Sequence, residues 1–282
     1  MIVVAVIIIA FVYISRRSLI NARRVKRKWE REVVLITGGC GALGMALHKE
    51  FKLKGVEKVY LVDKECKDES FADSFMRCDL TNSEDTSKLV QAIAPTIIIS
   101  NCAVFNGAKP FLKTSKLDDY ERAINVNFLA HVNLTRLLMA KAKQLHIVNI
   151  GSCLGLVGVP YVGDYCASKF ALYGFNESLR TELYANGNSN VKTMMVCPFF
   201  INDGGMFPPI YNRFPFITRT LTSREVAKAV IDGIENNTEE IWLPWFVRLV
   251  PIFRLLPTRV FDLGQFILGT HLAYPVDATS GR

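Results

Sequence analysis

Along the chain, short runs rich in valine and isoleucine alternate with longer stretches in which apolar residues recur at helical spacing. The strand-like runs cover residues 33–37, 58–62, 75–78, 96–100, 146–150, 191–197 and 240–243. Strands that are apolar throughout and separated by helix-length segments are typical of a parallel sheet with helices on both faces. The pattern therefore predicts an α/β fold, a single doubly wound Rossmann-type domain with a parallel sheet of about seven strands.

Three helix starts are marked by a hydroxyl residue followed three positions later by an acid, which is the pattern of a capping box. The pairs are Thr81 with Glu84, Ser115 with Asp118, and Thr222 with Glu225. No repeat, low-complexity stretch or linker interrupts this region, so we expect one domain over residues 32–244. Residues 1–31 and 245–282 are expected to be appendages to it.

The first 14 residues contain no charge, and Arg16 and Arg17 follow directly. A cleavable signal peptide would carry its positive charge before the apolar run, so we interpret the segment as a retained N-terminal membrane-anchor helix. About 15 helical residues reach only ~22 Å, so a monotopic insertion is as acceptable as a full span. The alternative is a buried helix of the domain. The positive-inside rule places the rest of the chain in the cytosol.

The net charge of +8 lies almost entirely at one end of the 282-residue chain. Residues 1–31 hold eight basic side chains and one acid, which leaves 26 basic and 25 acidic residues in the remainder. A nearly neutral body argues against a nucleic-acid-binding face. A basic collar beside an apolar leader instead favours anionic lipid headgroups as its partner.

Seven cysteines occur without a Cys-x-x-Cys pair or a neighbouring histidine cluster. We interpret all seven as reduced thiols in the cytosol, with no disulfide and no metal site.

A glycine-rich turn, Thr37-Gly38-Gly39-Cys40-Gly41-Ala42-Leu43-Gly44, follows the first predicted strand. Glycines there allow a sharp turn and let a pyrophosphate approach the N-terminus of the next helix. The second strand ends at Asp63, where a dinucleotide fold places the acid that binds the ribose 2′-hydroxyl. A carboxylate repels a 2′-phosphate, so we expect NAD(H) to be preferred, while the adjacent Lys64 keeps NADP(H) open.

A serine, a tyrosine and a lysine stand at a distinctive spacing: Ser152 precedes Tyr165 by 13 residues, and Lys169 follows it by four. Because residues four apart share one face of a helix, the lysine is expected to lower the pKa of the tyrosine. Over about residues 32–240 the chain resembles the short-chain dehydrogenase/reductase superfamily, whose core motif is this Tyr-x-x-x-Lys with its upstream serine.

The resemblance implies a hydride transfer with Tyr165 as general acid/base, Ser152 orienting the reacting oxygen, and Asn127 anchoring a water in the proton relay. It implies that Lys169 also holds the nicotinamide ribose. The other cofactor-binding residues that it implies are Thr37, Gly38, Gly41, Leu43, Gly44, Asp63, Asp79, Leu80, Asn101, Tyr165, Pro198 and Ile201. No metal is implied.

The chain departs from the family's pattern without losing a catalytic side chain. The middle loop glycine is replaced by Ala42 and the last glycine of the Asn-Asn-Ala-Gly element by Ala103, while Phe199 follows Pro198 in place of glycine. We therefore predict an active enzyme. The alternatives are an NADPH-dependent ketoreductase of lipid synthesis and a weakly active lipid-surface scaffold.

The C-terminal stretch 242–272 mixes aromatic, aliphatic and arginine residues and is broken by three prolines. This composition suits a membrane interface, a substrate lid, an oligomer contact or a buried core segment. Together with the leader it is similar to the membrane and lipid-droplet branch of the superfamily that includes 17-beta-hydroxysteroid and microsomal retinol dehydrogenases. That similarity implies a lipophilic alcohol or ketone as substrate, an endoplasmic reticulum or lipid-droplet location, and a homodimer.

Overall fold

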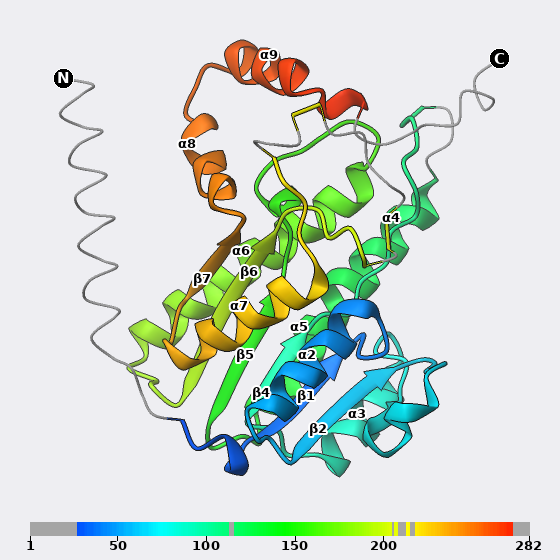
Figure 1. Cartoon of the computed structure of the whole chain (residues 1–282), viewed down its shortest axis with the longest axis vertical. Helices are drawn as coiled ribbons and strands as arrows, with labels where there is room; N and C mark the ends of the chain where they lie inside the picture. Colours follow the sequence, from blue (N-terminus) through cyan, green and yellow to red (C-terminus); the bar gives the residue numbers. More distant parts are fainter. Residues whose placement is uncertain (1–26, 113–115, 205, 208–212, 215–217, 273–282) are drawn as a thin grey trace.

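The computed structural model describes residues 27–112, 116–204, 206–207, 213–214 and 218–272. One parallel sheet runs through this part of the chain in the order β3-β2-β1-β4-β5-β6-β7 (Figure 1). The strands are β1 Val33–Thr37, β2 Lys58–Asp63, β3 Phe75–Arg77, β4 Ile97–Ser100, β5 Leu145–Ile150, β6 Val191–Pro198 and β7 Glu240–Leu243. The chain moves outward from β1 through β2 to β3 and then returns to β4. The carboxyl ends of β1 and β4 therefore flank the switch point, where open α/β sheets bind ligands.

Helices connect the strands and cover both faces of the sheet (Figure 1). Their bounds are α2 Ala42–Leu53, α3 Ser83–Ala92, α4 Leu117–Ile124, α5 Ala130–Met139, α6 Gly163–Ala185, α7 Ser223–Glu235, α8 Val250–Phe253 and α9 Thr258–Leu268. A π-helical turn, η3 (Asn125–Leu129), joins α4 to α5. Short 3-10 turns complete the described chain: η1 Trp29–Arg31, η2 Glu69–Ser74, η4 Cys153–Gly155, η5 Trp245–Leu249 and η6 Thr270–Leu272.

The core consists of two layers because successive strand residues point to opposite faces. On one face, Val34 and Ile36 pack with side chains of α2 and α7 such as Phe51. On the other, Leu35 packs with side chains of α3, α5 and α6 such as Leu134. Sequestering both faces of the strands explains why their sequences are apolar throughout.

The structure confirms the predicted fold and all seven predicted strands, with ends that agree to within one residue. The capping box of Thr222 and Glu225 forms as predicted. The helix start predicted at Thr81 is displaced by one residue, because the Asn82 side chain accepts hydrogen bonds from the Glu84 and Asp85 amides and α3 begins at Ser83. Ser115 lies outside the described residues.

The end of the basic collar packs against the domain. Trp29 is 8% exposed, meets the Phe51 ring edge to face and donates a hydrogen bond to Glu235. Arg27 forms an ion pair with Glu32 at 3.0 Å. The apolar leader lies outside the described residues, and among those that are described no helix is both long and apolar enough to cross a bilayer.

Candidate active site

The glycine-rich turn connects β1 to the N-terminus of α2. Gly38 has φ of +59°, a backbone conformation that favours glycine. A Cβ on Gly44 would lie 2.5 Å from the carbonyl oxygens of Gly38 and Gly39, so this position admits no side chain. Gly41 is the N-cap of α2, and no side chain caps the helix there. The first amides of α2 therefore remain available to an anion, and the dipole of the helix favours one.

Thr37 and Asn101 fasten this turn to β4. The Thr37 hydroxyl accepts hydrogen bonds from the Asn101 and Cys102 amides at 2.9 and 3.0 Å. The Asn101 side-chain amide donates to the carbonyl oxygens of Thr37 and Gly38, each at 3.0 Å. These two residues, both expected from the sequence at a cofactor site, position the turn.

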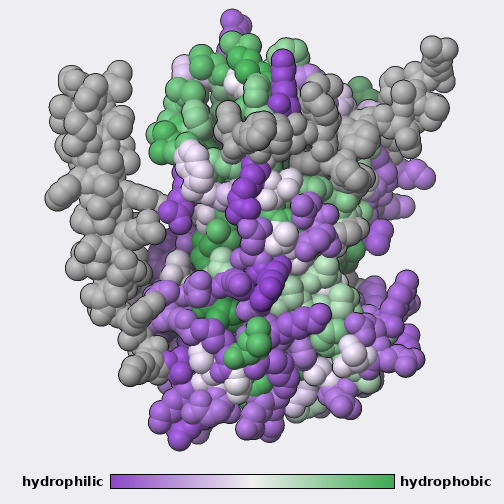
Figure 2. Space-filling model, in the orientation of Figure 1, coloured by the Kyte–Doolittle hydropathy of each residue, from purple (hydrophilic) through white to green (hydrophobic). Residues whose placement is uncertain are grey.

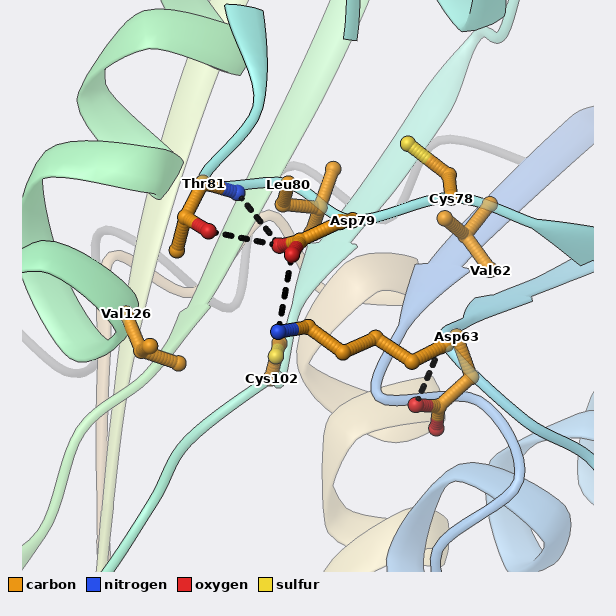
Figure 3. Close-up of a pocket in the computed structure, with 9 residues that line it drawn as sticks. Val62, Asp63, Cys78, Asp79, Leu80, Thr81, Cys102 and Val126 are labelled. Carbon is orange, nitrogen blue, oxygen red and sulfur yellow. Dashed lines mark hydrogen bonds and ion pairs between the residues drawn. The ribbon is translucent and has the colours of Figure 1, made fainter. Parts of the chain in front are cut away.

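Asp63 ends β2 beside the turn. One carboxylate oxygen accepts a hydrogen bond from the Cys40 amide at 3.2 Å, and the other accepts from the Lys64 amide at 2.8 Å. The Lys64 ammonium contacts the carboxylate of Asp79 at 2.8 Å across a small cavity (Figure 3). The cavity is lined by Val62, Asp63, Lys64, Cys78, Asp79, Leu80, Thr81, Cys102 and Val126. Asp63, Asp79 and Leu80, which the family resemblance implies as cofactor-binding residues, all line this cavity.

Both carboxylate oxygens of Asp79 have partners. One of its oxygens accepts from the amide and hydroxyl of Thr81, at 3.0 and 2.6 Å, and the other faces Lys64. Burial raises the pKa of Asp79, but the hydrogen bonds from Lys64 and Thr81 outweigh it and keep the pKa below its usual value. Asp79 is therefore ionised at neutral pH.

The cysteine prediction needs correction. Cys40 in the glycine-rich turn and Cys66 beyond the end of β2 form a disulfide, whereas all seven cysteines were expected to be reduced. The two residues are 26 apart in sequence, and the parallel pairing of β1 with β2 brings their Cα atoms to 5.3 Å. Sequence spacing carries no sign of this proximity. The other five cysteines are free.

Ser152, Tyr165 and Lys169 meet at the carboxyl edge of the sheet. Ser152 follows β5 and caps η4, where its hydroxyl accepts a hydrogen bond from the Leu154 amide. Tyr165 and Lys169 lie in the first two turns of α6, and both are almost fully buried. The Lys169 ammonium lies 5.6 Å from the centre of the Tyr165 ring and donates to the Ile150 carbonyl oxygen at 2.9 Å. The three residues singled out by their spacing in the sequence therefore lie together in the structure.

Burial dominates the electrostatics of the cluster. It raises the pKa of Tyr165 above its usual value, and a hydrogen bond with the Ser152 side chain only partly offsets that rise. Burial also lowers the pKa of Lys169 to about 8. The pKa of Tyr165 was predicted to fall beside Lys169; burial instead raises it, because the phenolate is removed from water.

Asn127 lies in the π-helical turn and is fully buried. Its side chain accepts from the Val104 amide at 2.7 Å and donates to the Ser168 hydroxyl at 2.9 Å. Ser168 in turn donates to the Tyr165 carbonyl oxygen at 2.8 Å. Asn127 is thereby connected to the helix that carries the tyrosine. Of the remaining predicted residues, Leu43 is buried in the first turn of α2, and Pro198 and Ile201 lie at and just beyond the end of β6 on the same edge of the sheet.

Three side chains near Tyr165 were missed by sequence reasoning. Ser168 stands inside the Tyr-x-x-x-Lys motif, so its position offered a signal. Phe105 and Phe207 meet the Tyr165 ring edge to face, with centroids 6.0 and 5.2 Å away, and lie 4.4 Å from each other. They come from the segments after β4 and β6, and nothing in their local sequence indicates that they converge.

No group of three or more metal-binding side chains is arranged to hold an ion within the described ranges. The chemistry available at this edge of the sheet is that of a hydroxyl, a phenol and a buried ammonium beside a glycine-rich turn. A doubly wound sheet with this constellation at its carboxyl edge defines the class of Rossmann-type oxidoreductases.

A match to a family model identifies the family within this class. The model described as short chain dehydrogenase matches residues 32–213, well over half of the chain. The chain belongs to the short-chain dehydrogenase family and is an oxidoreductase.

Proteins of similar sequence are also named as dehydrogenases. The chain is 33% identical over 233 residues to a Bos taurus protein named short-chain dehydrogenase/reductase family 16C member 6, covering 76% of this chain and 73% of the relative. It is 29% identical over 246 residues to human 17-beta-hydroxysteroid dehydrogenase 13, with 81% and 80% covered. It is 31% identical over 257 residues to mouse epidermal retinol dehydrogenase 2, with 84% and 82% covered.

Solved structures share the fold. A short chain dehydrogenase from Burkholderia cenocepacia in complex with NADP matches with a TM-score of 0.70 at 21% identity, covering 84% of this chain and 98% of that one. A short chain dehydrogenase/reductase from Burkholderia phymatum in complex with NAD matches with a TM-score of 0.65 at 18% identity, covering 89% and 99%.

Proposed function

We propose that this protein is a membrane-anchored oxidoreductase that transfers a hydride between a nicotinamide dinucleotide and a hydroxyl or carbonyl group of a lipophilic substrate. The observation that carries the proposal is the cluster of Ser152 with the buried Tyr165 and Lys169 on the same edge of the sheet as the glycine-rich turn. A steroid, a retinoid or another lipid is the substrate class, in keeping with the names of the relatives.

The residues at the turn fit a dinucleotide. Gly38 and Gly44 leave a cradle that side chains would fill, and the uncapped N-terminus of α2 suits a pyrophosphate. Asp63 would hold the adenosine ribose, and Asp79 and Leu80 would border the adenine. We propose that NAD(H) is preferred to NADP(H), because Asp63 opposes a 2′-phosphate and Lys64 is engaged by Asp79. Once bound, the cofactor would supply or accept the hydride.

The chain's own side chains would move the proton. In carbonyl reduction, Tyr165 donates its hydroxyl proton to the substrate oxygen while Ser152 hydrogen-bonds the same oxygen. The raised pKa keeps Tyr165 protonated at neutral pH, as a general acid must be. Lys169 places a positive charge beside the phenolate that forms, and Asn127 anchors a water that would return the proton.

Aromatic and aliphatic side chains surround the reacting edge. Phe105 and Phe207 flank Tyr165, and the apolar cluster that contains Tyr165 extends to Phe199 and Phe246. A charged substrate would lose its hydration there without a compensating partner, which disfavours it. This environment supports a lipophilic alcohol or ketone.

We also propose that the leader of residues 1–14 anchors the protein and that the C-terminal extension, 245–282, contacts the same membrane. Helices α8 and α9 bury no residue, and hydrophobic side chains gather over them (Figure 2). Those more than half exposed are Trp245, Ile252, Phe253, Leu255, Leu263, Phe266 and Ile267. Apolar residues beside arginines suit a lipid interface. The endoplasmic reticulum membrane and the lipid droplet both offer such a surface on the cytosolic side.

The emission of Trp245 tests this contact. Full-length protein mixed with phosphatidylcholine and phosphatidylserine vesicles that carry brominated acyl chains should lose tryptophan emission, and Trp245→Phe should abolish most of that loss. Trp245 is 67% exposed, and the other two tryptophans, Trp29 and Trp242, remain in the variant, so the difference between the two proteins isolates Trp245. Unquenched Trp245 in vesicle-bound protein would show that η5, at the start of the C-terminal extension, faces away from the lipid, even if the leader is inserted.

Separate titrations with NADH and NADPH, followed by nicotinamide fluorescence in detergent, test the cofactor proposal. We expect the unmodified protein to bind NADH more tightly than NADPH. In Asp63→Ala, the affinity for NADH should fall about tenfold, which is about 1.4 kcal/mol, and the affinity for NADPH should rise. Asp73→Ala, an exposed acid on the neighbouring turn, is the matched control.

The other outcomes of this titration select the competing functions. Tighter binding of NADPH by the unmodified protein would favour an NADPH-dependent ketoreductase of lipid synthesis. Binding of neither dinucleotide would favour the weakly active lipid-surface scaffold. The family resemblance also leads us to propose a homodimer, which sedimentation of the detergent-solubilised protein would test.

A further inference from the structure

The Cys40–Cys66 disulfide links the glycine-rich turn to the segment that follows Asp63. Cys40 belongs to the glycine-rich turn, and Cys66 lies three residues beyond Asp63. The Cys40 amide donates to the Asp63 carboxylate at 3.2 Å. The disulfide therefore adjoins the carboxylate proposed to hold the adenosine ribose.

The glycine-rich turn is fastened to both neighbouring strands at Gly38 and Gly39, and less firmly at Cys40. On the β4 side, Asn101 and Thr37 form four hydrogen bonds, and Gly38 packs so closely that a Cβ would come within 2.8 Å of the Cys102 backbone. On the β2 side, the Gly39 amide donates to the Val62 carbonyl oxygen at 3.2 Å, and a Cβ on Gly39 would come within 2.7 Å of the Leu61 backbone. Beyond Gly39, Cys40 is joined to the β2 side by its hydrogen bond to Asp63 and by the disulfide. Opening the disulfide would therefore loosen the turn from Cys40 onward while Gly38 and Gly39 stay fixed.

The pair also differs in its surroundings from four of the five other cysteines. Cys78, Cys153, Cys166 and Cys197 are buried thiols, and burial raises the pKa of each. Buried thiols with raised pKa values are poor partners in thiol–disulfide exchange because the thiolate is the reacting form. Cys40 and Cys66 are only half-buried, within reach of a small thiol from solution.

We propose that Cys40 and Cys66 form a reversible thiol–disulfide couple that sets the affinity of the glycine-rich turn for the dinucleotide, with a low-molecular-weight disulfide of the glutathione class as oxidant. The proposal rests on the dinucleotide site and the cytosolic orientation of the proposed function. Disulfides that face a reducing compartment are usually transient and redox-sensing.

The exchange balances in two steps. One cysteine thiolate attacks a sulfur of oxidised glutathione, so a protein–glutathione disulfide forms and one glutathione thiolate leaves. The second cysteine thiolate then attacks the protein sulfur of that mixed disulfide, so the Cys40–Cys66 bond forms and the second glutathione thiolate leaves. Two protons and two electrons pass from the cysteine pair to the glutathione pair, and reduced glutathione reverses both steps.

The oxidised state should bind the dinucleotide more tightly. The disulfide holds the Cys40 amide and the Asp63 carboxylate together before the ligand arrives, so less ordering accompanies binding. We expect an NADH dissociation constant about fivefold lower in the oxidised than in the reduced protein. Hydrogen exchange of the backbone amides of residues 38–44 should be faster in the reduced protein, with or without a dinucleotide.

The experiment equilibrates full-length protein with oxidised or reduced glutathione and determines the Cys40–Cys66 linkage by mass spectrometry of peptides. The same samples are used for NADH titration and amide hydrogen exchange. Cys66→Ser and Cys40→Ser should each remove the redox response in both measurements. Cys197→Ala, which removes a fully buried thiol, should keep it.

Three results would overturn the couple: no Cys40–Cys66 linkage in oxidised glutathione, equal hydrogen exchange in both states, or equal and measurable NADH affinities in both states. A redox-dependent exchange rate without NADH binding in either state would contradict the proposed function and with it the control of affinity. The amide hydrogen-exchange measurement distinguishes an absence of NADH binding from a failure of the disulfide to form.

Discussion

Replacing Tyr165 by phenylalanine should reduce kcat on the order of 10² to 10⁴-fold, the range for losing a positioned general acid. Phenylalanine keeps the ring that packs edge to face on Phe105 and Phe207 and removes only the hydroxyl. The dissociation constant of NADH should therefore change less than about twofold, an effect too small to indicate a lost hydrogen bond. Single-turnover reduction by NADH of the ketone or aldehyde that corresponds to estradiol or retinol, whichever reacts faster, and NADH titration measure the two effects.

Tyr184→Phe is the matched control. Tyr184 lies near the end of α6, the helix that also carries Tyr165, and it is 89% exposed. It should retain full activity. A Tyr165→Phe protein that retains more than a tenth of the activity would remove Tyr165 from the role of general acid. A parallel loss of NADH binding would show instead that the substitution had disturbed the site.

Replacing Lys169 by methionine should lower kcat/KM on the order of 10²-fold and remove a pH dependence. Burial lowers the pKa of Lys169 from 10.5 to about 8, so the ammonium is present below pH 8 and lost above it. Tyr165 stays protonated across this range because its pKa is raised. For carbonyl reduction, kcat/KM of the unmodified enzyme should be level below pH 8 and fall about tenfold per unit above it. The kcat/KM of Lys169→Met should be low and should not change with pH over the same range.

The control for this experiment is Lys228→Met, since Lys228 is an exposed lysine on α7. It should keep both the rate and the alkaline decline. Methionine at 169 leaves no buried charge, but the Ile150 carbonyl oxygen loses its donor, which costs about 1 to 3 kcal/mol of folding stability. Thermal unfolding distinguishes this cost from the catalytic effect. An alkaline decline that persists in Lys169→Met would assign it to another group.

Features that depend on local pattern were predictable from the sequence. The seven apolar runs predicted the seven strands because a strand that is covered on both faces must be apolar along its whole length. The spacing of Tyr165 and Lys169 predicted that they share a helix face. The helix start at Thr81 was wrong by one residue, because Asn82 competes for the same amides and sequence pattern alone does not rank neighbouring caps.

Features that depend on long-range proximity were not predictable. The Cys40–Cys66 disulfide requires the register of β1 against β2, and the two phenylalanines beside Tyr165 come from segments about a hundred residues apart. The pKa of Tyr165 was predicted to fall because a neighbouring charge can be seen in the sequence, whereas the degree of burial cannot. Burial proved the larger effect.

The sequence by itself determined the fold, the spacing of Ser152, Tyr165 and Lys169, and the glycine-rich turn, because these follow from periodicity, from residue spacing and from backbone positions that admit only glycine. The tertiary structure decided what surrounds each of them. Parallel strand pairing placed the Asp63 carboxylate within hydrogen-bond distance of the Cys40 amide, and Lys64 forms an ion pair with Asp79. Packing excluded water from Tyr165 and Lys169, and that exclusion sets both of their pKa values. Desolvation and contact are properties of the folded chain, since they depend on residues distant in sequence.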